Sequence, residues 1–528
     1  MEIQHFPFDE IPQFSERDIA YTTAHPELRD FYKYEVNLAA FKAVFEDKSK
    51  ENTNRKALVA NLKQQHQAFQ PHEKIQQQIE ALARENTFTV VTAHQPSLFT
   101  GPLYFVYKIF STINLAEQLN AHYKDYQVVP VFVLGSEDHD FEEINHTYLF
   151  NKKIEWQNDE KGAVGWMKTA TLQSTLEQLK DVLGDSDLAK TLYEKAERSF
   201  TQHETYGVAA QNLVQELFQD YGLVVLNMNQ ADLKREFIPY IKKEILEQPS
   251  QALIQATQEA LAEKGFSSQA HPREINFFYL SDQIRNRIVL EDDIYKVLDT
   301  DIQFTEAEIL AEIEQHPERF SPNVVMRPLY QEVILPNLAY VGGGGELAYW
   351  QERLSQFAHF GVNFPMLVRR NSVLWVDKGN QKRLEKVGLD IKDLFGEVEA
   401  LIKTYVQENT ENELSLKQEK AQVQEIFAGV VQKAVEIDPG LKKTVLSEQA
   451  KLLNAINALE AKLLRAEKNR YEITINQIRS LKERLFPSGL QERHDNFMAF
   501  YLKNGAAFFD TLKANLNPLD KRFLVVVE

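Results

Sequence analysis

The chain has no cysteine among its 528 residues, and this absence removes several kinds of chemistry. It excludes disulfides, thiolate metal sites and a cysteine nucleophile. No apolar run approaches the roughly 18 residues that a membrane span requires. The first ten residues, MEIQHFPFDE, lack the basic and apolar regions of a signal peptide. We therefore expect a cytoplasmic protein with no membrane partner.

Basic charge is also in short supply, because the formal net charge is −18. Neutralising nucleic-acid phosphates needs a basic face, so we expect no nucleic-acid partner. An anionic small molecule would need a local basic pocket. The remaining composition, 43% hydrophobic and 26% charged, is that of a globular protein with a large core. The length predicts a large domain with insertions and at least one appended element.

Short apolar runs alternate with stretches of helical periodicity. The runs lie at residues 89–92, 128–134, 223–228, 338–341 and 364–368. This alternation predicts the α/β class, with a Rossmann-like core built on a parallel sheet that is covered on both faces. Ligands of such sheets bind beyond the carboxyl ends of the strands, so the polar residues after each run are the candidates for a site.

We divide the chain into four regions. Residues 1–85 form an N-terminal helical layer of the core domain, and residues 86–380 form the Rossmann-like core. Residues 381–490 form a coiled-coil hairpin, and residues 491–528 form a tail that packs back on the core. The core has insertions at about 151–205 and 249–320, which are too long for ordinary connections and are expected to close over the site.

The hairpin is predicted from two antiparallel α-helical arms of nearly equal length, Ile391–Ile437 and Leu441–Leu485, joined at Pro439-Gly440. Each arm would be about 65 Å long at 1.5 Å per residue if it were continuous. Residues Asn409–Asn412 are expected to interrupt the first arm. An apolar seam of this length usually finds a partner, so we expect a homodimer formed through the coiled coil.

The first candidate loop lies between residues 93 and 108. We expect a buried strand, a polar loop and a helix that begins with Pro102. Free backbone N–H groups and the positive end of the helix dipole would then face an anion. Alternatively, the loop only connects two elements. The candidate binding residues here are His94, Gln95, Thr100, Gly101, Tyr104 and Lys108.

The second candidate loop is the densest polar cluster, residues 137–146. If a helix begins near Asp140, then His139, Glu143 and His146 share one face. The cluster could act in acid/base chemistry, or its acidic residues could only complement a helix dipole. The spacing does not match a zinc signature, so we assign no metal. The catalytic candidates are Glu137, Asp138, His139 and Asp140, and Asn145 is a binding candidate.

The remaining candidates follow later strands. Four glycines can form an anion-binding nest, although their spacing matches neither a dinucleotide fingerprint nor a Walker loop, and a tight turn is the alternative. Arginines could clamp a carboxylate or phosphate, although paired arginines are more often surface ion pairs. These candidates are Gly342, Gly343, Gly344, Gly345, Glu346, Tyr349, Arg327, Gln331, Arg369 and Arg370.

Several segments together resemble the BshC family, the cysteine ligases of bacillithiol biosynthesis. They are HQPSLFTGPLYFVYK at 94–108, VPVFVLGSEDHDFEEINH at 129–146, LPNLAYVGGGGELAYW at 335–350, IDPGL at 437–441 and LFPSGLQER at 485–493. The chain departs from the family pattern at Ala93-His94, where Gly-Gln is usual, and at Gly344, where Pro is common. The resemblance implies a Rossmann-like core, connecting insertions and a coiled coil used for dimerisation.

The resemblance also implies the reaction: addition of L-cysteine to glucosaminyl malate through an amide bond, the last step of bacillithiol biosynthesis. Such a condensation needs an activated carboxylate, so ATP with Mg²⁺ is expected. One alternative is a nucleotidyltransferase or synthetase-like enzyme that activates another carboxylate. The other is a non-catalytic coiled-coil assembly protein whose Rossmann-like core binds a ligand.

Overall fold

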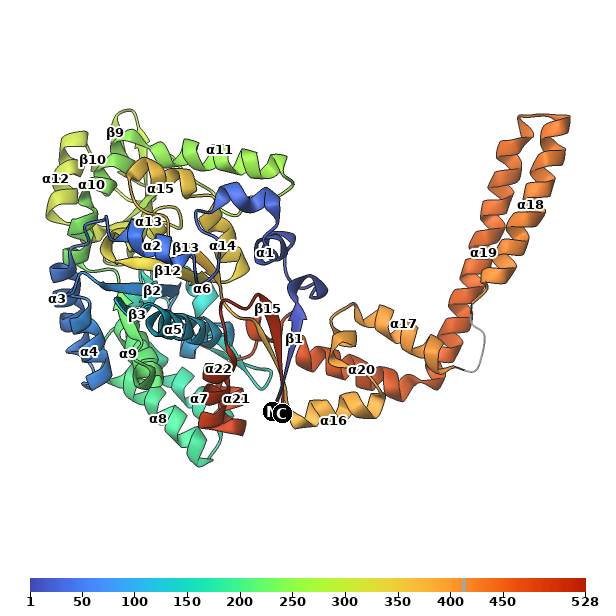
Figure 1. The fold of residues 1–528 in the computed structure, drawn as a ribbon, viewed down its shortest axis with the longest axis horizontal. Helices are drawn as coiled ribbons and strands as arrows, with labels where there is room; N and C mark the ends of the chain where they lie inside the picture. Colours follow the sequence, from blue (N-terminus) through green and yellow to red (C-terminus); the bar gives the residue numbers. More distant parts are fainter. Residues whose placement is uncertain (411–414) are drawn as a thin grey trace.

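A parallel sheet forms the centre of the protein, whose computed structural model describes residues 1–410 and 415–528. The sheet has five strands in the order β13-β12-β2-β3-β6 (Figure 1). Their bounds are β2 Thr87–His94, β3 Gln127–Leu134, β6 Val224–Asn227, β12 Asn337–Gly342 and β13 Met366–Arg369. Read from β6, the chain order is 3-2-1-4-5, as in a Rossmann fold, and the order reverses between β2 and β12. The predicted fold class is confirmed.

The strands are apolar on both sides because helices cover both faces of the sheet. In β2, Phe88 and Val90 join the cluster that contains α2 (Phe41–Lys48). Val91 and Ala93 face the other way, into the cluster that contains α3 (Arg55–His66) and α10 (Ala231–Glu247). Burying each large apolar side chain is worth roughly 1.5–3 kcal/mol. Because successive side chains point to opposite faces of the sheet, this burial fixes the face on which each residue of β2 lies.

The helix after β2 starts later than predicted. α5 spans Tyr104–His122, so Pro102 is not its first residue. A 3₁₀ turn, Leu98–Thr100, comes first. The main-chain N–H of Leu103, just before the helix, donates to the carbonyl of Asp495 at 2.7 Å. The tail of the chain thus packs against this helix start, which is not the open anion site that we predicted.

Two segments interrupt the core. The first contains β4 (His146–Leu149), β5 (Lys152–Glu155), α7 (Gln173–Leu183) and α8 (Asp187–Gln202), and α9 (Tyr206–Phe218) follows it. The second forms an antiparallel sheet in the order β10-β9-β8-β7-β11. Its elements are α11 Pro249–Glu263, β7 Phe277–Ser281, β8 Ile284–Glu291, β9 Ile294–Val297, β10 Gln303–Phe304, α12 Glu306–Gln315 and β11 Phe320–Pro322.

The two ends of the chain meet in one small sheet with the order β1-β15-β14. Figure 1 shows the N- and C-termini side by side, between the core and the base of the arm. The strands are β1 Glu2–Pro7, β14 Val373–Val376 and β15 Arg522–Val527. Helices α1 (Glu16–Thr22) and α4 (Glu73–Ala81) belong to the N-terminal region, and α21 (Met498–Asn504) and α22 (Ala506–Asn515) belong to the tail. The tail therefore packs against the core.

The C-terminal helices form an arm that leads away from the core to a projecting hairpin (Figure 1). Its inner part contains α16 (Lys378–Val387), α17 (Val398–Asn409) and α20 (Glu472–Leu485), and the hairpin is α18 (Lys417–Ile437) with α19 (Leu441–Arg470). No helix in the described ranges is long and apolar enough to cross a membrane.

Neither predicted arm is one continuous helix, so neither reaches the 65 Å that a continuous arm would have. α18 has 21 residues and α19 has 30, so they are about 32 and 45 Å long. The second arm breaks at Tyr471, between α19 and α20. In the first, α17 ends at Asn409. The rest of the predicted interruption, which extends to Asn412, lies mostly outside the described residues.

Candidate functional site

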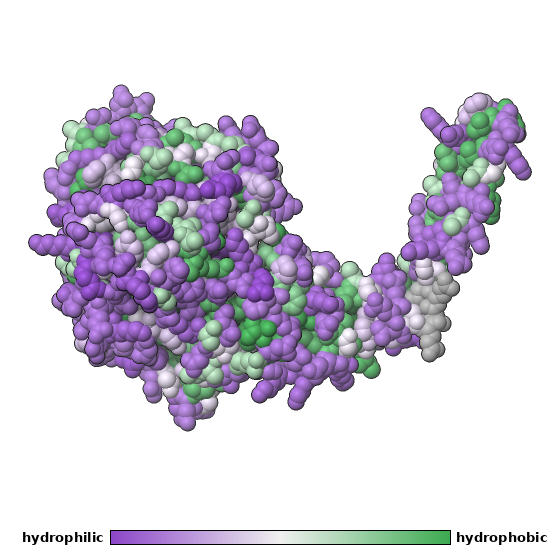
Figure 2. Space-filling model, in the orientation of Figure 1, coloured by the Kyte–Doolittle hydropathy of each residue, from purple (hydrophilic) through white to green (hydrophobic). Residues whose placement is uncertain are grey.

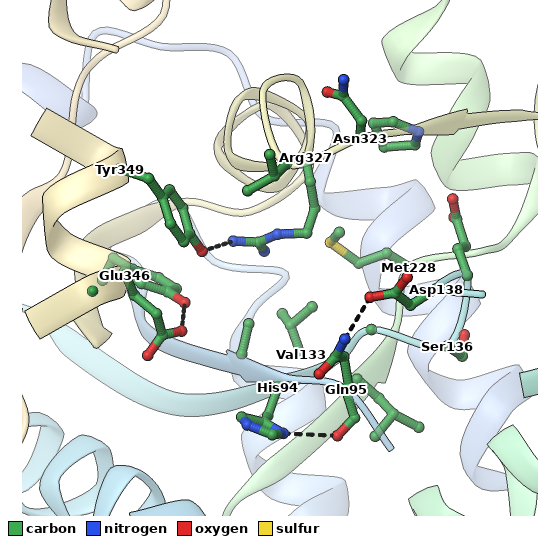
Figure 3. Close-up of a pocket in the computed structure, with 18 of the residues that line it drawn as sticks. His94, Gln95, Val133, Ser136, Asp138, Met228, Asn323, Arg327, Glu346 and Tyr349 are labelled. Carbon is green, nitrogen blue, oxygen red and sulfur yellow. Dashed lines mark hydrogen bonds between the residues drawn. The ribbon is translucent and has the colours of Figure 1, made fainter. Parts of the chain in front are cut away.

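A cavity of about 980 Å³ lies where the strand order reverses, beyond the carboxyl ends of β2, β3 and β12. The second insertion and the C-terminal tail also line it. Figure 3 shows His94, Gln95 and Asp138 on one side and Arg327, Glu346 and Tyr349 on the other. The lining includes these sequence-predicted residues: His94, Gln95, Tyr104, Lys108, Glu137, Asp138, His139, Arg327, Gly343, Gly344, Gly345, Glu346, Tyr349, Arg369 and Arg370.

Two predicted residues of the first loop lie outside the cavity lining. Thr100 and Gly101 have positive φ angles of 74° and 65° and form a tight turn. The side-chain amide of Asn496 donates to the carbonyl of Gly101 at 2.8 Å. In this structure they shape the turn between β2 and α5, away from the cavity lining where we expected them.

Four other candidates also lie outside the cavity lining. Asp140 caps the four-residue helix α6 (Phe141–Ile144), where its carboxylate accepts from the N–H of Glu143 at 3.3 Å. Because α6 is so short and His146 lies in β4, the predicted common face of His139, Glu143 and His146 does not form. The other three are Asn145, which precedes β4, Gln331, which lies behind Arg327, and Gly342, which ends β12.

His94 is a neutral ring fixed at both nitrogens. Its Nδ1 lies 3.0 Å from the carbonyl of Gln95, so Nδ1 carries the proton and Nε2 accepts from the Tyr104 hydroxyl at 3.1 Å. Burial and the nearby Lys108 lower the pKa of His94 to about 4. Burial raises the pKa of Tyr104 to about 12, so its hydroxyl keeps its proton. These two residues supply shape and hydrogen bonds rather than charge.

Glu346 fills the glycine-rich turn that we predicted to bind an external anion. The turn leads from β12 into α14 (Gly344–Gln351). The carboxylate of Glu346 accepts from the N–H of Gly343 at 2.8 Å and from the Tyr340 hydroxyl at 2.7 Å, and it pairs with Lys108 at 2.6 Å. Burial disfavours its charge, but these three contacts outweigh burial and lower the pKa to about 2.

Asp138 and His139 form a second polar group with Arg285 of β8. The side-chain amide of Gln95 donates to Asp138 at 2.6 Å, and Arg285 lies 3.7 Å from the same carboxylate. Burial disfavours the charge of Asp138, but hydrogen bonds from the main-chain N–H of His139 and from the side chain of Gln95, together with the charge of Arg285, hold its pKa well below its usual range. Asp138 is therefore ionised at neutral pH.

The same arginine sets the hydrogen-bonding role of the His139 ring. Arg285 Nη1 lies 2.5 Å from His139 Nδ1. A guanidinium can only donate, so Nδ1 of His139 is the acceptor in this contact and the ring N–H lies on Nε2. The ring of His139 also lies beside Phe278 of β7, at 5.3 Å between centroids. The His139 ring can thus donate a hydrogen bond through Nε2.

The predicted arginine clamp is already occupied. Arg369 makes a bidentate pair with Asp18 at 2.9 and 3.0 Å. Arg370 makes another with Glu492 at 3.1 and 2.8 Å. All four side chains are buried. These arginines therefore carry little free charge toward the cavity, and their main role is to join distant segments beneath it.

The cations without a carboxylate partner make the cavity suited to anions. Within the ranges that the structure describes, no ion pair engages Arg273, Arg287, Arg327 or Arg493. Arg273 and Arg493 are exposed, whereas Arg287 and Arg327 are partly buried. Guanidinium groups bind carboxylates and phosphates in bidentate geometry. The cavity can therefore hold a substrate with more than one negative group.

Sequence reasoning missed the partners that come from far along the chain. Lys234 of α10 is fully buried and pairs with Glu137 at 2.9 Å. Arg285 and Arg287 are two positions apart in β8, so their side chains lie on the same side of the strand. This spacing was visible in the sequence. Glu492 and Arg493 lie in the LFPSGLQER segment, which carried the resemblance but suggested no role. Asp18 gave no signal in the sequence.

The comparisons with known proteins match nearly the whole chain. The model described as "Bacillithiol biosynthesis BshC, N-terminal Rossmann-like domain" matches residues 1–371, and "Bacillithiol biosynthesis BshC, C-terminal coiled-coil domain" matches residues 373–528. The chain belongs to the BshC family. Its membership confirms the family resemblance seen in the sequence, and the BshC models divide the chain between β13 and β14.

Curated BshC relatives are similar over nearly their full length. A "Putative cysteine ligase BshC" from Flavobacterium johnsoniae is 40% identical, with 96% of each chain covered. A relative with the same name from Christiangramia forsetii is 39% identical, with 98% of each chain covered. Another from Bacillus cereus is 29% identical, covering 93% of this chain and 94% of its own. The BshC family places the chain in bacillithiol biosynthesis.

Proposed function

We propose that this chain is the ligase that joins L-cysteine to glucosaminyl malate through an amide bond. The observation that carries the proposal is the cavity at the reversal of strand order, which has arginines that no carboxylate neutralises in the described part of the chain. The names of its curated relatives support a cysteine substrate and the ligase class. A malate group carries two carboxylates, and such a substrate suits this charge distribution.

Arginines from different elements would hold the anionic substrate. Arg327, at the start of α13 (Arg327–Ile334), lies beside Tyr349 of α14. Arg287 comes from β8 of the second insertion, and Arg493 comes from the tail. Binding would therefore bring the core, the insertion and the tail to the same molecule. This is how the geometry would orient the amine for attack.

Asp138 and His139 divide the proton chemistry in this proposal. Asp138 stays ionised, so it accepts the proton that the attacking amine loses. The Nε2–H of His139 donates a hydrogen bond to the oxyanion that develops on the activated carboxyl group. Glu137 lies beside them, and its carboxylate is paired with Lys234.

The lining of the cavity suits the phosphates of a nucleotide better than it suits a metal ion held by protein side chains alone. The unpaired arginines suit the phosphates of ATP, which would supply the acyl phosphate or adenylate that amide formation needs. The carboxylates of the lining, Glu137, Asp138 and Glu346, are each engaged by a cation. Among the described residues no group of three or more carboxylates and histidines could hold a metal. Mg²⁺ would then be held mainly by the phosphates.

We also propose a homodimer formed through the hairpin of α18 and α19. Ile426, Leu452, Leu459 and Leu463 are large apolar residues that are exposed in the single chain. Figure 2 shows hydrophobic surface on the hairpin, near its tip. A second copy would cover these side chains in an antiparallel or parallel bundle.

Ligation in a reconstituted assay tests the proton roles. Asp138→Ala and His139→Ala should each lower kcat by at least about 100-fold, the usual contribution of a positioned acid or base. Asp140→Ala is the matched control, because Asp140 lies in the same loop but caps α6, and it should retain activity. Full activity in both test variants would remove the proposed roles.

Thiol profiling of a deletion strain tests the pathway step. We expect loss of bacillithiol and accumulation of glucosaminyl malate, both reversed by the wild-type chain. Adenylate formation that needs no glucosaminyl malate would instead favour a synthetase for another acceptor. Unchanged thiols in the deletion strain would contradict the ligase proposal.

A further inference from the structure

Arg327 differs from the other buried cations around the cavity. Lys108, Arg369 and Arg370 each pair with a carboxylate within 3 Å. Arg327 has no such partner within the described ranges. Its guanidinium donates instead to Gln331 Oε1 at 3.1 Å and to the Tyr349 hydroxyl at 3.4 Å. Figure 3 shows it extending across the cavity toward Tyr349. Its positive charge is therefore held in place by neutral groups.

The orientation of the Gln331 side chain is set by Glu332, on the side away from Arg327. Its amide nitrogen donates to Glu332 Oε1 at 2.9 Å, and Asn337 donates to the same oxygen at 2.7 Å. A carboxylate accepts hydrogen bonds, so it requires the nitrogen of the Gln331 amide to face it. The oxygen of the amide must then face Arg327. A flipped amide would direct its N–H groups toward the guanidinium, where neither group could accept.

Glu332 is a buried carboxylate without a direct cation on its side chain. It is 1% exposed, and its Oε2 has no hydrogen-bond partner among the described residues. Lys48 donates to the main-chain carbonyl of Glu332 at 2.8 Å, and its own carboxylate partner is Glu51. Burial raises the pKa of Glu332 to about 7. Burying a carboxylate without a paired cation costs folding free energy, so we expect a role for Glu332 at the cavity.

The Gln331 side-chain amide lies between Glu332 and Arg327, so the Arg327 guanidinium is oriented without contact with a carboxylate. A carboxylate in contact with Arg327 would fix the guanidinium but would also neutralise it, as Glu492 does for Arg370. The Glu332 carboxylate instead orients the Gln331 amide, and the Gln331 amide orients the Arg327 guanidinium. Residues 327 and 331 are four apart on α13, so their side chains lie on the same face of the helix.

We propose that Arg327 binds the anionic group of the substrate, and that Gln331 and Glu332 are positioning residues that hold its guanidinium in the cavity without neutralising it. The identity of that substrate, a malate-bearing molecule, rests on the proposed function. The anion site itself depends only on the geometry of Arg327, Gln331 and Glu332.

Equilibrium binding of L-malate and of inorganic phosphate to the full chain tests this inference by calorimetry. Gln331→Glu should weaken binding of both probes by at least about tenfold, because it gives Arg327 a carboxylate partner. Gln331→Met, which removes the hydrogen bonds without adding charge, should weaken binding by about threefold. Glu332→Gln should have an effect of similar size, because its amide no longer fixes that of Gln331.

Gln351→Glu is the matched control. Gln351 is also buried and its Oε1 accepts from an arginine, Arg17, at 3.0 Å, but neither residue lines the cavity. It should leave probe binding unchanged. Melting temperatures of all variants are compared with that of the wild type. If Gln331→Glu does not fold, Gln331→Met and Glu332→Gln decide the result.

Ligation kinetics separate positioning from general damage. The Gln331 variants should raise KM for glucosaminyl malate more than they change kcat. Wild-type affinity in both Gln331 variants, equal losses in Gln331→Glu and Gln351→Glu, or absence of probe binding by the wild type would each overturn the inference. Anion binding that depends on Arg327 in a protein that does not ligate would retain the inference and reject the proposed function.

Discussion

The cavity and the hairpin are stabilised in opposite ways. The cavity depends on buried ion pairs between segments that are far apart, such as Asp18 with Arg369, which are separated by 351 positions. The hairpin joins two helices that are adjacent in sequence, and α18 has no buried residue. Single substitutions should therefore destabilise the cavity region strongly, whereas substitutions in the hairpin should leave the fold of the single chain nearly unchanged.

The largest effect is expected at the pair between Arg370 and Glu492. Glu492→Ala leaves the Arg370 guanidinium buried without its carboxylate. The free energy of unfolding should fall by about 3–5 kcal/mol, measured by urea unfolding followed by circular dichroism. Glu425→Ala removes an exposed carboxylate of α18 and should change stability by less than about 0.5 kcal/mol. Equal losses of unfolding free energy in the two variants would contradict the difference between the cavity region and the hairpin.

The glycine turn provides a matched pair within the cavity. A Cβ at residue 344 would lie 2.0 Å from Asp18 Cγ and would displace the carboxylate that holds Arg369. Gly344→Ala should therefore destabilise the fold by about 2–3 kcal/mol in thermal unfolding. A Cβ at residue 345 meets nothing within 4 Å. Gly345→Ala should fold normally, and weaker anion binding by this variant would indicate a ligand close to the helix start.

Glu346 predicts a dependence of stability on pH. Its pKa is lowered from 4.5 to about 2 in the folded state. A lowered carboxyl pKa stabilises the fold above the unfolded pKa, and this contribution is lost as the pH falls through the folded value. Between about pH 4.5 and pH 2 the wild type should lose up to about 3 kcal/mol more than Glu346→Gln. Parallel acid-unfolding curves for the two proteins would contradict the assignment.

The smallest effect on folding is expected in the hairpin. The double variant Ile426→Glu, Leu459→Glu places charges at positions that are 64% and 54% exposed in the single chain. The free energy of unfolding should change by less than about 1 kcal/mol. Analytical ultracentrifugation should nevertheless show monomers in place of the proposed dimer. A dimer that persists in this variant would place the contact elsewhere.

Much of the fold could be predicted because it depends on local periodicity. The apolar runs at 128–134 and 338–341 identified β3 and β12, since a strand buried on both sides must be apolar throughout. The start of α5 could not be predicted, because it depends on Asp495, which lies far along the chain. The break at Tyr471 was missed for a different reason: the apolar spacing there continues with only a change of phase.

The candidate site was predicted as a set of loops but not as a set of partners. Strand ends could be read from the sequence, so Asp138, Lys108 and Glu346 were found. Their pairing could not be read, and Arg369 and Arg370 were interpreted as free cations although Asp18 and Glu492 neutralise them. Gln331 was placed in the cavity, yet it lies behind Arg327. Such errors concern contacts between distant residues, which no local pattern specifies.

The pair between Arg370 and Glu492 also ties together the two points where the arm leaves and rejoins the body. Arg370 precedes β14 and Glu492 follows α20, so both crossings are fixed at the cavity wall. Separating these buried charges would cost about 3–5 kcal/mol, so we expect the root of the arm to stay fixed to the cavity wall. The break at Tyr471, between α19 and α20, lies further out along the arm.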